Sequence, residues 1–292
     1  MTTNFSDLVE RAMQLSKAHM RPVIEKELLH YDILFILDKN NLLDDLVFQG
    51  GTALRLCYGA SRYSEDLDFA GGKNFSSHQL IEMKTCLEKY LGEKYGLSVF
   101  VKEPKDFLME PIDHIHVDKW QVSIITSPEK KDIPTQKIKI EVINIPAYSP
   151  QPCALRNNYD FLPDGYSDTL VMTETIDEIF ADKCVSLINC SRYIRYRDIW
   201  DLRWLKQKGA VINLQYIKNK ISDYKITDYI EKLNIFLEKS NGIIHGKAMA
   251  QELSRFIPMD SQESTLKKNK FLDFLENEIK NIFIEIKKRC DH

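Results

Sequence analysis

The sequence predicts an α+β protein in which a mixed β-sheet precedes a helical C-terminal domain. A strand, a Gly-Gly turn and a helix follow one another directly over 46–58. Further strands, indicated by period-two alternation of apolar residues, are expected at 99–101, 122–126 and 138–142. From residue 174 onward the apolar spacing is helical. We therefore expect two domains, 1–165 and 166–292.

The first half of the chain is expected to begin with two helices. Ser6 can cap a helix that continues to about His19, and Pro22 suits the first turn of a second helix, whose apolar spacing runs to Leu37. A short apolar strand at 46–48 then ends at the two glycines. A helix from Thr52, a strand at 66–69 and a helix over 77–94 capped by Ser76 or Ser77 are expected next.

The alternating strands are expected to end at a proline cluster, Pro146, Pro150 and Pro152, which should break the sheet. The chain then leaves the first domain near Asp164-Gly165. In the second domain, 271–286 carries an amphipathic stripe with lysines opposite, which we interpret as the core packing of a helical domain.

Composition and net charge argue against several classes of protein. The 292-residue chain can bury a full core, and its net charge of −3 argues against broad charge-driven nucleic-acid binding while leaving room for a local basic groove. Six scattered cysteines without a Cys-x-x-Cys pair indicate reduced thiols. No secretory signal pattern occurs, and no apolar run approaches the ~20 residues that span a bilayer. We expect a cytoplasmic protein with no membrane partner.

The turn Gly50-Gly51-Thr52 is a candidate phosphate site. Between a strand and a helix, two glycines allow phosphate oxygens to approach consecutive backbone N–H groups at a helix N-terminus. The Thr52 hydroxyl can bind phosphate or cap the helix. Taken alone, the turn is also compatible with a purely structural role.

Asp66 and Asp68 strengthen the phosphate interpretation. On a strand, these carboxylates share one face while Leu67 and Phe69 enter the core. Two like charges so close together are unfavourable without a cation between them. Mg²⁺ (or Mn²⁺) takes one or two carboxylates together with substrate phosphates, so we predict a metal site here. A pair of solvated aspartates is the alternative.

Three neighbouring residues are weaker candidates. Glu141 lies on the polar face of its strand, where it would complete the metal site or belong to a charged rim with lysines. Arg62 would pair with a triphosphate or neutralise the two aspartates, and Ser64 would contact phosphate or end the strand.

A second charged group is expected in the helical half. Lys183 falls on an otherwise apolar helix face and suits a phosphate as a point charge. Asp198 and Asp201, at i and i+3, share a helix face and would position Lys183, a base or an attacking hydroxyl. A solvated salt-bridge network is the alternative. His114 and His116 lack a third ligand at zinc spacing.

These motifs resemble the AbiEii-type nucleotidyltransferase toxins of bacterial toxin–antitoxin and abortive-infection systems. The resemblance covers about residues 20 to 205 and rests on motifs in the family's order. They are Glu25-Lys26-Glu27-Leu28, Phe48-x-Gly50-Gly51-Thr52-Ala53-Leu54, Arg62-x-Ser64-Glu65-Asp66-Leu67-Asp68-Phe69, Glu178-x-x-Ala181-x-Lys183 and Arg197-Asp198-x-x-Asp201-Leu202.

The resemblance implies a polymerase-β-like nucleotidyltransferase core with a helical C-terminal domain. It implies Mg²⁺ at Asp66 and Asp68, and phosphate contacts from the glycine turn and Lys183. It also implies a catalytic aspartate in the last motif, for which we favour Asp198. Gln49 departs from the lysine often found before the two glycines, so Arg55 or Arg62 is expected to supply the missing charge.

The resulting hypothesis is Mg²⁺-dependent transfer of a nucleotide from an NTP to an acceptor hydroxyl on RNA, with the tRNA 3′ end implied by the family. The resemblance also implies a cognate antitoxin encoded nearby and a role in phage defence. Two alternatives stay open: an NTP-binding or partner-binding module without turnover, and a nucleotidyltransferase that acts on a protein or small molecule.

Overall fold

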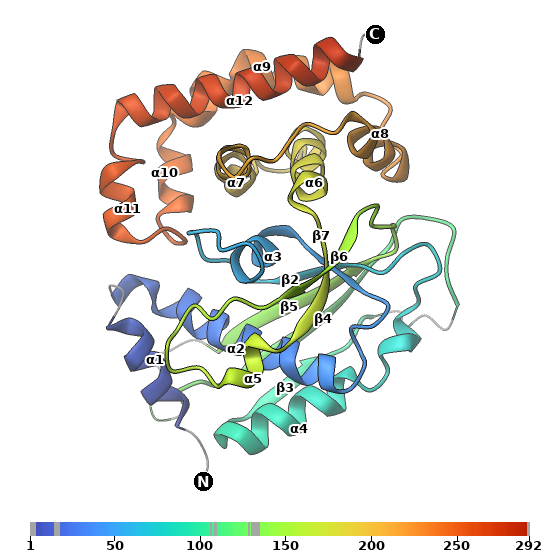
Figure 1. Cartoon of the computed structure of the whole chain (residues 1–292), viewed down its shortest axis with the longest axis vertical. Coiled ribbons are helices and arrows are strands. Elements are labelled where there is room, and N and C mark those ends of the chain that lie inside the picture. The colour runs from blue at the N-terminus through green and yellow to red at the C-terminus, as the bar shows by residue number, and fades with distance from the viewer. Residues whose placement is uncertain are drawn as a thin grey trace. The chain divides into compact units, whose positions relative to one another are not determined.

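The protein forms two compact units, Met1–Glu174 and Thr175–His292. Figure 1 shows this computed structural model, with the first unit coloured blue to yellow-green and the second yellow to red. The structure describes residues 4–14, 18–105, 107, 110–127, 129 and 135–290.

A mixed sheet forms the centre of the first unit, and its described strands follow the order β3-β4-β5-β2-β1-β7-β6. The strands are β1 (Val47–Gln49), β2 (Leu67–Ala70), β3 (Val99–Lys102), β4 (Val117–Ile124), β5 (Gln136–Ile143), β6 (Pro150–Ala154) and β7 (Leu170–Glu174). The pairs β2–β5 and β1–β7 are parallel, and the other pairs are antiparallel. This sheet confirms the α+β class and its mixed topology.

The first unit also contains helices, several of which pack against the strands. They are α1 (Phe5–Met13), α2 (Arg21–Lys39), α3 (Gly50–Leu56), α4 (Met83–Tyr95) and α5 (Asp164–Ser167), with 3₁₀ turns at Ala18–Met20 and Ser77–Leu80. The first helix begins two residues earlier than expected, because Asn4 caps it in place of Ser6, and it ends at Met13. The expected continuation through 15–17 lies outside the described residues. Ser76 caps the second 3₁₀ turn, as one of the two expected positions.

The two faces of the central strands differ in burial, as their alternation predicts. One face is apolar and buried, and α2 packs against it at β5. Its residues on β2 and β5 are Leu67, Phe69, Ile138, Ile140 and Val142. The opposite face of β5 carries the exposed side chains of Lys137 and Lys139. One face of the central strands therefore packs into the core, and the opposite face presents polar side chains.

Two strands were not expected from the sequence. β6 contains Pro150 and Pro152, which we expected to break the sheet, but the strand is at an edge, where missing backbone donors are tolerated. β7 follows residue 165, where the sequence prediction ended the first domain, and it pairs with β1 in the sheet. The first unit accordingly continues to Glu174.

The second unit is helical throughout its described part. Its helices are α6 (Ile176–Asn189), α7 (Tyr196–Gln207), α8 (Leu214–Asp223), α9 (Tyr229–Ile244), α10 (Lys247–Leu253), α11 (Met259–Ser264) and α12 (Asn269–Cys290). α6 packs against α7, α8 and α9, and α12 packs against α9. The apolar stripe of α12 is buried at Leu275, Ile279, Ile282, Phe283 and Ile286, which supports its interpretation as core.

None of the helices in the described residues combines the length and the apolar character that a bilayer crossing requires. Even the 22-residue α12 is amphipathic, with Lys287, Lys288 and Arg289 in its last turn.

α2 also holds the segment that leads into β2. His30 Nε2 lies 3.0 Å from the carbonyl oxygen of Glu65, and Lys26 Nζ lies 2.8 Å from the Glu65 carboxylate. Burial lowers the pKa of His30 to about 4. The imidazole is therefore neutral near pH 7, and its Nε2–H donates to the carbonyl. This contact fixes the backbone immediately before Asp66.

We expect the protein to lose stability as the pH falls from about 6.5 to about 4, because the unfolded chain binds a proton at His30 that the folded chain excludes. The loss in free energy of unfolding from this residue should be on the order of 3 kcal/mol. Urea unfolding near pH 7 and near pH 4.5 measures it. The difference in free energy of unfolding between these two pH values should be smaller in His30→Gln than in the wild type. It should be unchanged in His78→Gln, which alters an exposed histidine. Equal differences in both variants would contradict the assignment.

Candidate active site

A row of polar side chains crosses four adjacent strands. Asp68 of β2 is the register partner of Gln49 on β1 and of Glu141 on β5. Glu141 is in turn the partner of Lys119 on β4, and Lys119 Nζ lies 3.0 Å from Glu141 Oε1. Partner residues on neighbouring strands point to the same face of a sheet. The fold therefore brings the two predicted metal ligands Asp68 and Glu141 side by side.

Asp66 lies one residue before β2 and contacts β5 rather than continuing the strand. Its Oδ1 accepts a hydrogen bond of 3.0 Å from the backbone N–H of Lys139, and Lys139 Nζ lies 3.6 Å from Oδ2. The carboxylate keeps 29% of its side-chain exposure. Asp66 is thus both an anchor for the end of β2 and an accessible oxygen donor.

The glycine turn packs closely around these carboxylates. Gly50 has a φ of +77°, and a Cβ at this position would lie 2.9 Å from Asp68 Oδ2. A Cβ on Gly51 would lie 2.5 Å from Arg62 Nη2 and 3.0 Å from Ser64 Oγ. Only glycine leaves these atoms room at both positions.

The remaining predicted residues of the first unit lie at the same turn. Thr52 is buried, and its hydroxyl donates a hydrogen bond to the carbonyl oxygen of Asp66. This bond ties the start of α3 to the segment that precedes β2. The turn, Arg62, Ser64 and the two aspartates therefore form one local cluster.

The structure separates the roles of the two arginines that were candidates for the missing positive charge. Arg55 binds Glu27 through two hydrogen bonds of 2.7 and 2.9 Å and donates to the carbonyl oxygen of Ala60. These hydrogen bonds engage the Arg55 guanidinium and join α3 to α2. Arg62 is buried, donates to the carbonyl oxygen of Tyr63 and lies against Gly51. Of the two, Arg62 is the cation at the glycine turn.

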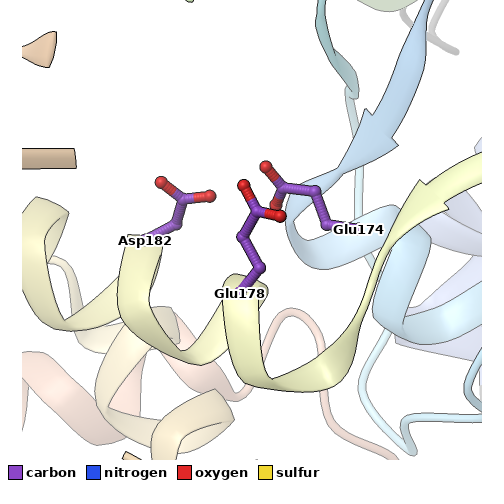
Figure 2. Close-up of side chains that lie close together, drawn as sticks. All are labelled: Glu174, Glu178 and Asp182. Atoms are coloured by element: carbon purple, nitrogen blue, oxygen red, sulfur yellow. The ribbon is translucent and has the colours of Figure 1, made fainter. Parts of the chain in front are cut away.

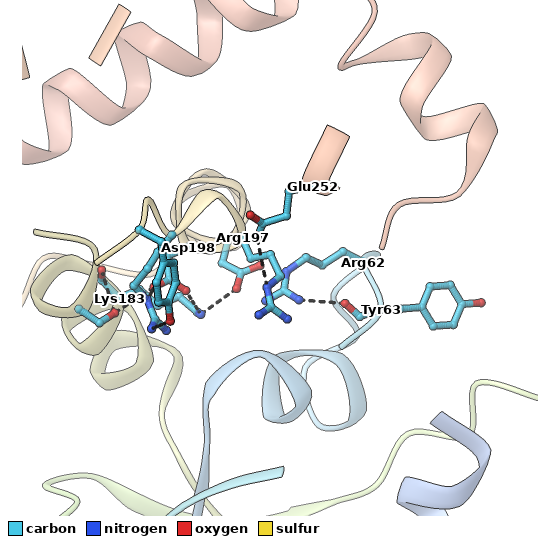
Figure 3. A network of polar contacts seen from close by, with 10 residues as sticks. Arg62, Tyr63, Lys183, Arg197, Asp198 and Glu252 are labelled. Atoms are coloured by element: carbon cyan, nitrogen blue, oxygen red, sulfur yellow. Dashed lines mark hydrogen bonds and ion pairs between the residues drawn. The ribbon is translucent and has the colours of Figure 1, made fainter. Parts of the chain in front are cut away.

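In the second unit, Lys183 and Asp198 form a buried ion pair, as Figure 3 shows. Lys183 Nζ lies 2.8 Å from Asp198 Oδ1 and 2.8 Å from Asp201 Oδ2. Ser186 and Arg195 hold the other oxygen of Asp198, Oδ2. The predicted grouping of Lys183 with the two aspartates is present within this unit, and it is buried rather than solvated.

The surroundings of Asp198 make it a weak base. Burial alone would raise the pKa of this carboxyl, but the Lys183 ammonium and the Arg195 guanidinium outweigh that effect and hold the pKa below its ordinary value. A carboxylate with a depressed pKa accepts a proton poorly near pH 7. The geometry therefore favours Asp198 as the group that positions Lys183.

An acidic group not foreseen from the sequence lies where the chain passes from β7 into α6. Figure 2 shows Glu174 at the end of the strand, with Glu178 and Asp182 one turn apart on the helix. One carboxylate oxygen of each lies within 4.8 Å of the others, a spacing that a metal ion could bridge. Within the second unit, the fully buried Lys220 lies 2.8 Å from Glu178 and 3.2 Å from Asp182. That ammonium already compensates the two helix carboxylates.

The site also contains Lys119, which the sequence prediction omitted. The sequence pattern that indicates Lys119 is the alternation of Lys119 and Gln121 with the buried Trp120 and Val122 along β4. The partner strand of β4 could not be identified from that pattern alone.

The comparison with protein families agrees with this geometry. Residues 32–277 match the family described as the nucleotidyl transferase AbiEii toxin of the type IV toxin–antitoxin systems. The chain belongs to this family. It is accordingly a nucleotidyltransferase, and membership in a toxin–antitoxin family implies a cognate antitoxin.

A solved structure shares the fold of this AbiEii-family protein. The crystal structure of JHP933 from Helicobacter pylori has a TM-score of 0.52 at 19% identity, covering 92% of this chain and 93% of that one. A candidate nucleotidyltransferase from H. pylori has a TM-score of 0.48 at 20% identity, covering 90% and 96%. No curated protein sequence matches this chain significantly.

We expect Gly50→Ala to abolish nucleotidyl transfer, because the new methyl group displaces the Asp68 carboxylate. Gly72→Ala is the matched control: Gly72 has a φ of +76°, with no atom within 4 Å of its added Cβ. Both variants should lose about 1–2 kcal/mol of stability from backbone strain, measured by urea unfolding. Only Gly50→Ala should lose transfer of labelled nucleotide, and equal activity in both would contradict the crowding argument.

Lys183→Met should destabilise the protein by roughly 3–5 kcal/mol, because it leaves two buried carboxylates without their shared ammonium. Lys206→Met is the control, since Lys206 forms a more exposed pair with Glu278 and should cost less than about 1 kcal/mol. Urea unfolding followed by the fluorescence of Trp200 and Trp204 in α7 measures both. A loss in Lys183→Met no larger than in the control would show that the pair is not structurally important.

Proposed function

We propose that this chain is a Mg²⁺-dependent (or Mn²⁺-dependent) toxin that transfers a nucleotide from an NTP to a hydroxyl of RNA, with a tRNA 3′ end as the favoured acceptor. The observation that carries the proposal is the placement of Asp68 beside Glu141, against the glycine turn. Paired carboxylates next to a turn that can accommodate phosphate suit a reaction on a Mg²⁺-bound nucleoside triphosphate.

Three carboxylates of the first unit would supply oxygen donors to a hard divalent cation. Asp68 and Glu141 are register partners on β2 and β5, and Asp66 directly precedes β2. Asp66 and Glu141 keep 29% and 24% of their side-chain exposure. Oxygen donors without sulfur or imidazole favour Mg²⁺ and Mn²⁺ over zinc. When bound, such an ion offsets the charge of the triphosphate and of the departing pyrophosphate.

The glycine turn and its neighbours would bind the triphosphate. Without side chains at Gly50 and Gly51, phosphate oxygens can reach the backbone N–H groups at the start of α3. The buried guanidinium of Arg62 would supply the positive charge that Gln49 does not. Ser64 Oγ, on the same side of Gly51, would donate a hydrogen bond. Catalysis would then rest on positioning and charge compensation.

The second unit would contribute Lys183 as a phosphate contact and Asp198 as its positioning residue. The family resemblance supplies these roles, and the buried pair within the unit supports them by fixing the ammonium. With the pKa of Asp198 held below its ordinary value, we assign deprotonation of the acceptor hydroxyl to a carboxylate of the first unit.

Arginines at and just before the start of α7, namely Arg192, Arg195 and Arg197, suit contacts to an RNA backbone. Arg195 is engaged by Asp198 and Arg197 by Glu252, at 3.6 Å, as Figure 3 shows for the second pair. Arg192 is exposed. We therefore propose Arg192 as the contact from this segment. We also propose that the protein is cytoplasmic, that its antitoxin gene lies nearby and that it acts in phage defence.

Asp68→Asn should lower label transfer at least about 100-fold, because it removes a charged ligand at the proposed metal site. The assay incubates pure protein with Mg²⁺, each of four labelled NTPs in turn, and total RNA. Asp45→Asn, at an exposed position, is the matched control and should retain wild-type transfer. Equal transfer by Asp68→Asn and wild type would refute the site.

The same assay separates the alternatives. Tight NTP binding without transfer by the wild type would favour a binding module, and label in protein or in a metabolite would favour a different acceptor. Induction in cells tests toxicity: growth arrest should be relieved by Asp68→Ala. Equal arrest by that variant would show that toxicity arises elsewhere.

A further inference from the structure

A basic cavity lies beside the carboxylates of the first unit. It has a volume of about 380 Å³, and four lysines line it from three strands and the segment after β3. They are Lys102, Lys105, Lys119 and Lys139. All four side chains are exposed. This concentration of positive charge contrasts with the net charge of −3 of the whole chain.

The lining holds more lysines than acidic residues. Its two acidic residues are Glu103 and Asp118. Glu103 lies 3.7 Å from Lys84, which is outside the lining, and Asp118 is buried, with Oδ1 3.1 Å from His116 Nε2. With four lysines against two carboxylates, the cavity attracts anions.

Two of the lysines connect the cavity to the candidate active site. Lys119 pairs with Glu141 and Lys139 with Asp66. An anion in the cavity would therefore sit directly next to the carboxylates.

The strand order distinguishes this cavity from the binding site of the donor triphosphate. The glycine turn follows β1, Asp68 and Glu141 lie on β2 and β5, and the cavity adjoins β4. At about 4.8 Å per strand, β1 and β4 are roughly 14 Å apart. The carboxylates lie between the turn and the cavity. An acceptor must reach them from the side that the donor does not occupy.

We propose that this cavity binds the phosphates of the acceptor RNA strand and so directs its terminal hydroxyl to the carboxylates. The inference rests on the proposed function and names the surface that would select a polyanionic acceptor. Lysine side chains suit this task because flexible point charges bind phosphodiesters without regard to base sequence.

The test uses the double variant Lys102→Ala/Lys105→Ala, which leaves the lysines paired to Glu141 and Asp66 unchanged. Binding of a short 5′-fluorescein single-stranded RNA is measured by anisotropy over a salt series in EDTA, without NTP. We expect about a tenfold loss of affinity and a salt slope shallower by about 1.4, from two lost phosphate contacts. Lys102→Arg/Lys105→Arg should retain binding. Lys73→Ala/Lys89→Ala, at exposed lysines outside the cavity, is the control and should match wild type.

NTP binding by calorimetry, with each of the four NTPs and Mg²⁺, completes the test and should be unchanged in the double alanine variant. Unchanged RNA affinity in that variant would overturn the inference. A loss of NTP affinity in place of RNA affinity would overturn it too, since the cavity would then hold the donor. No label transfer by wild type refutes the proposed function, whereas normal transfer with unchanged RNA binding in the variant refutes the cavity alone.

Discussion

The repulsion among neighbouring carboxylates beside the glycine turn is the constraint on which the rest of the first unit depends. The parallel pairing of β2 with β5 holds Asp68 next to Glu141 on one face of the sheet, and Asp66 directly precedes β2. The same register aligns the apolar residues that form the core. The chain cannot separate the charges without losing that core. Positive charge must therefore be brought to them.

The surroundings supply that charge from two sides. On the β4 side, Lys119 and Lys139 pair with two of the carboxylates and are exposed enough to change partners when an anion arrives. On the β1 side, Arg62 is buried against Gly51 and lies in a fixed place. A fixed cation suits a donor that always binds in one pose, and mobile cations suit an acceptor strand of variable sequence. The difference between the two sides thus parallels the difference between the two substrates in our proposal.

Local patterns in the sequence were sufficient to predict the elements that carry the site. Alternation along 138–142 placed Glu141 opposite the core, and the two glycines placed the turn, because both depend on residues close in the chain. The pairing of Glu141 with Asp68, and of Arg55 with Glu27, joins segments far apart in sequence and could not be read from spacing. The cavity could not be predicted from the sequence for the same reason. Lys102 and Lys139 become neighbours only once β3, β4 and β5 are paired.

The proline-containing strand β6 has a consequence for how copies of this chain meet one another. An open sheet leaves a row of unpaired backbone groups at each outer strand, which can act as a template for a strand from another molecule. Pro150 and Pro152 remove two amide hydrogens from β6, which forms one of these edges. A strand from another molecule therefore cannot form a complete set of backbone hydrogen bonds with β6. The residues that we expected to end the sheet instead protect it from edge-to-edge aggregation while newly made chains are crowded together.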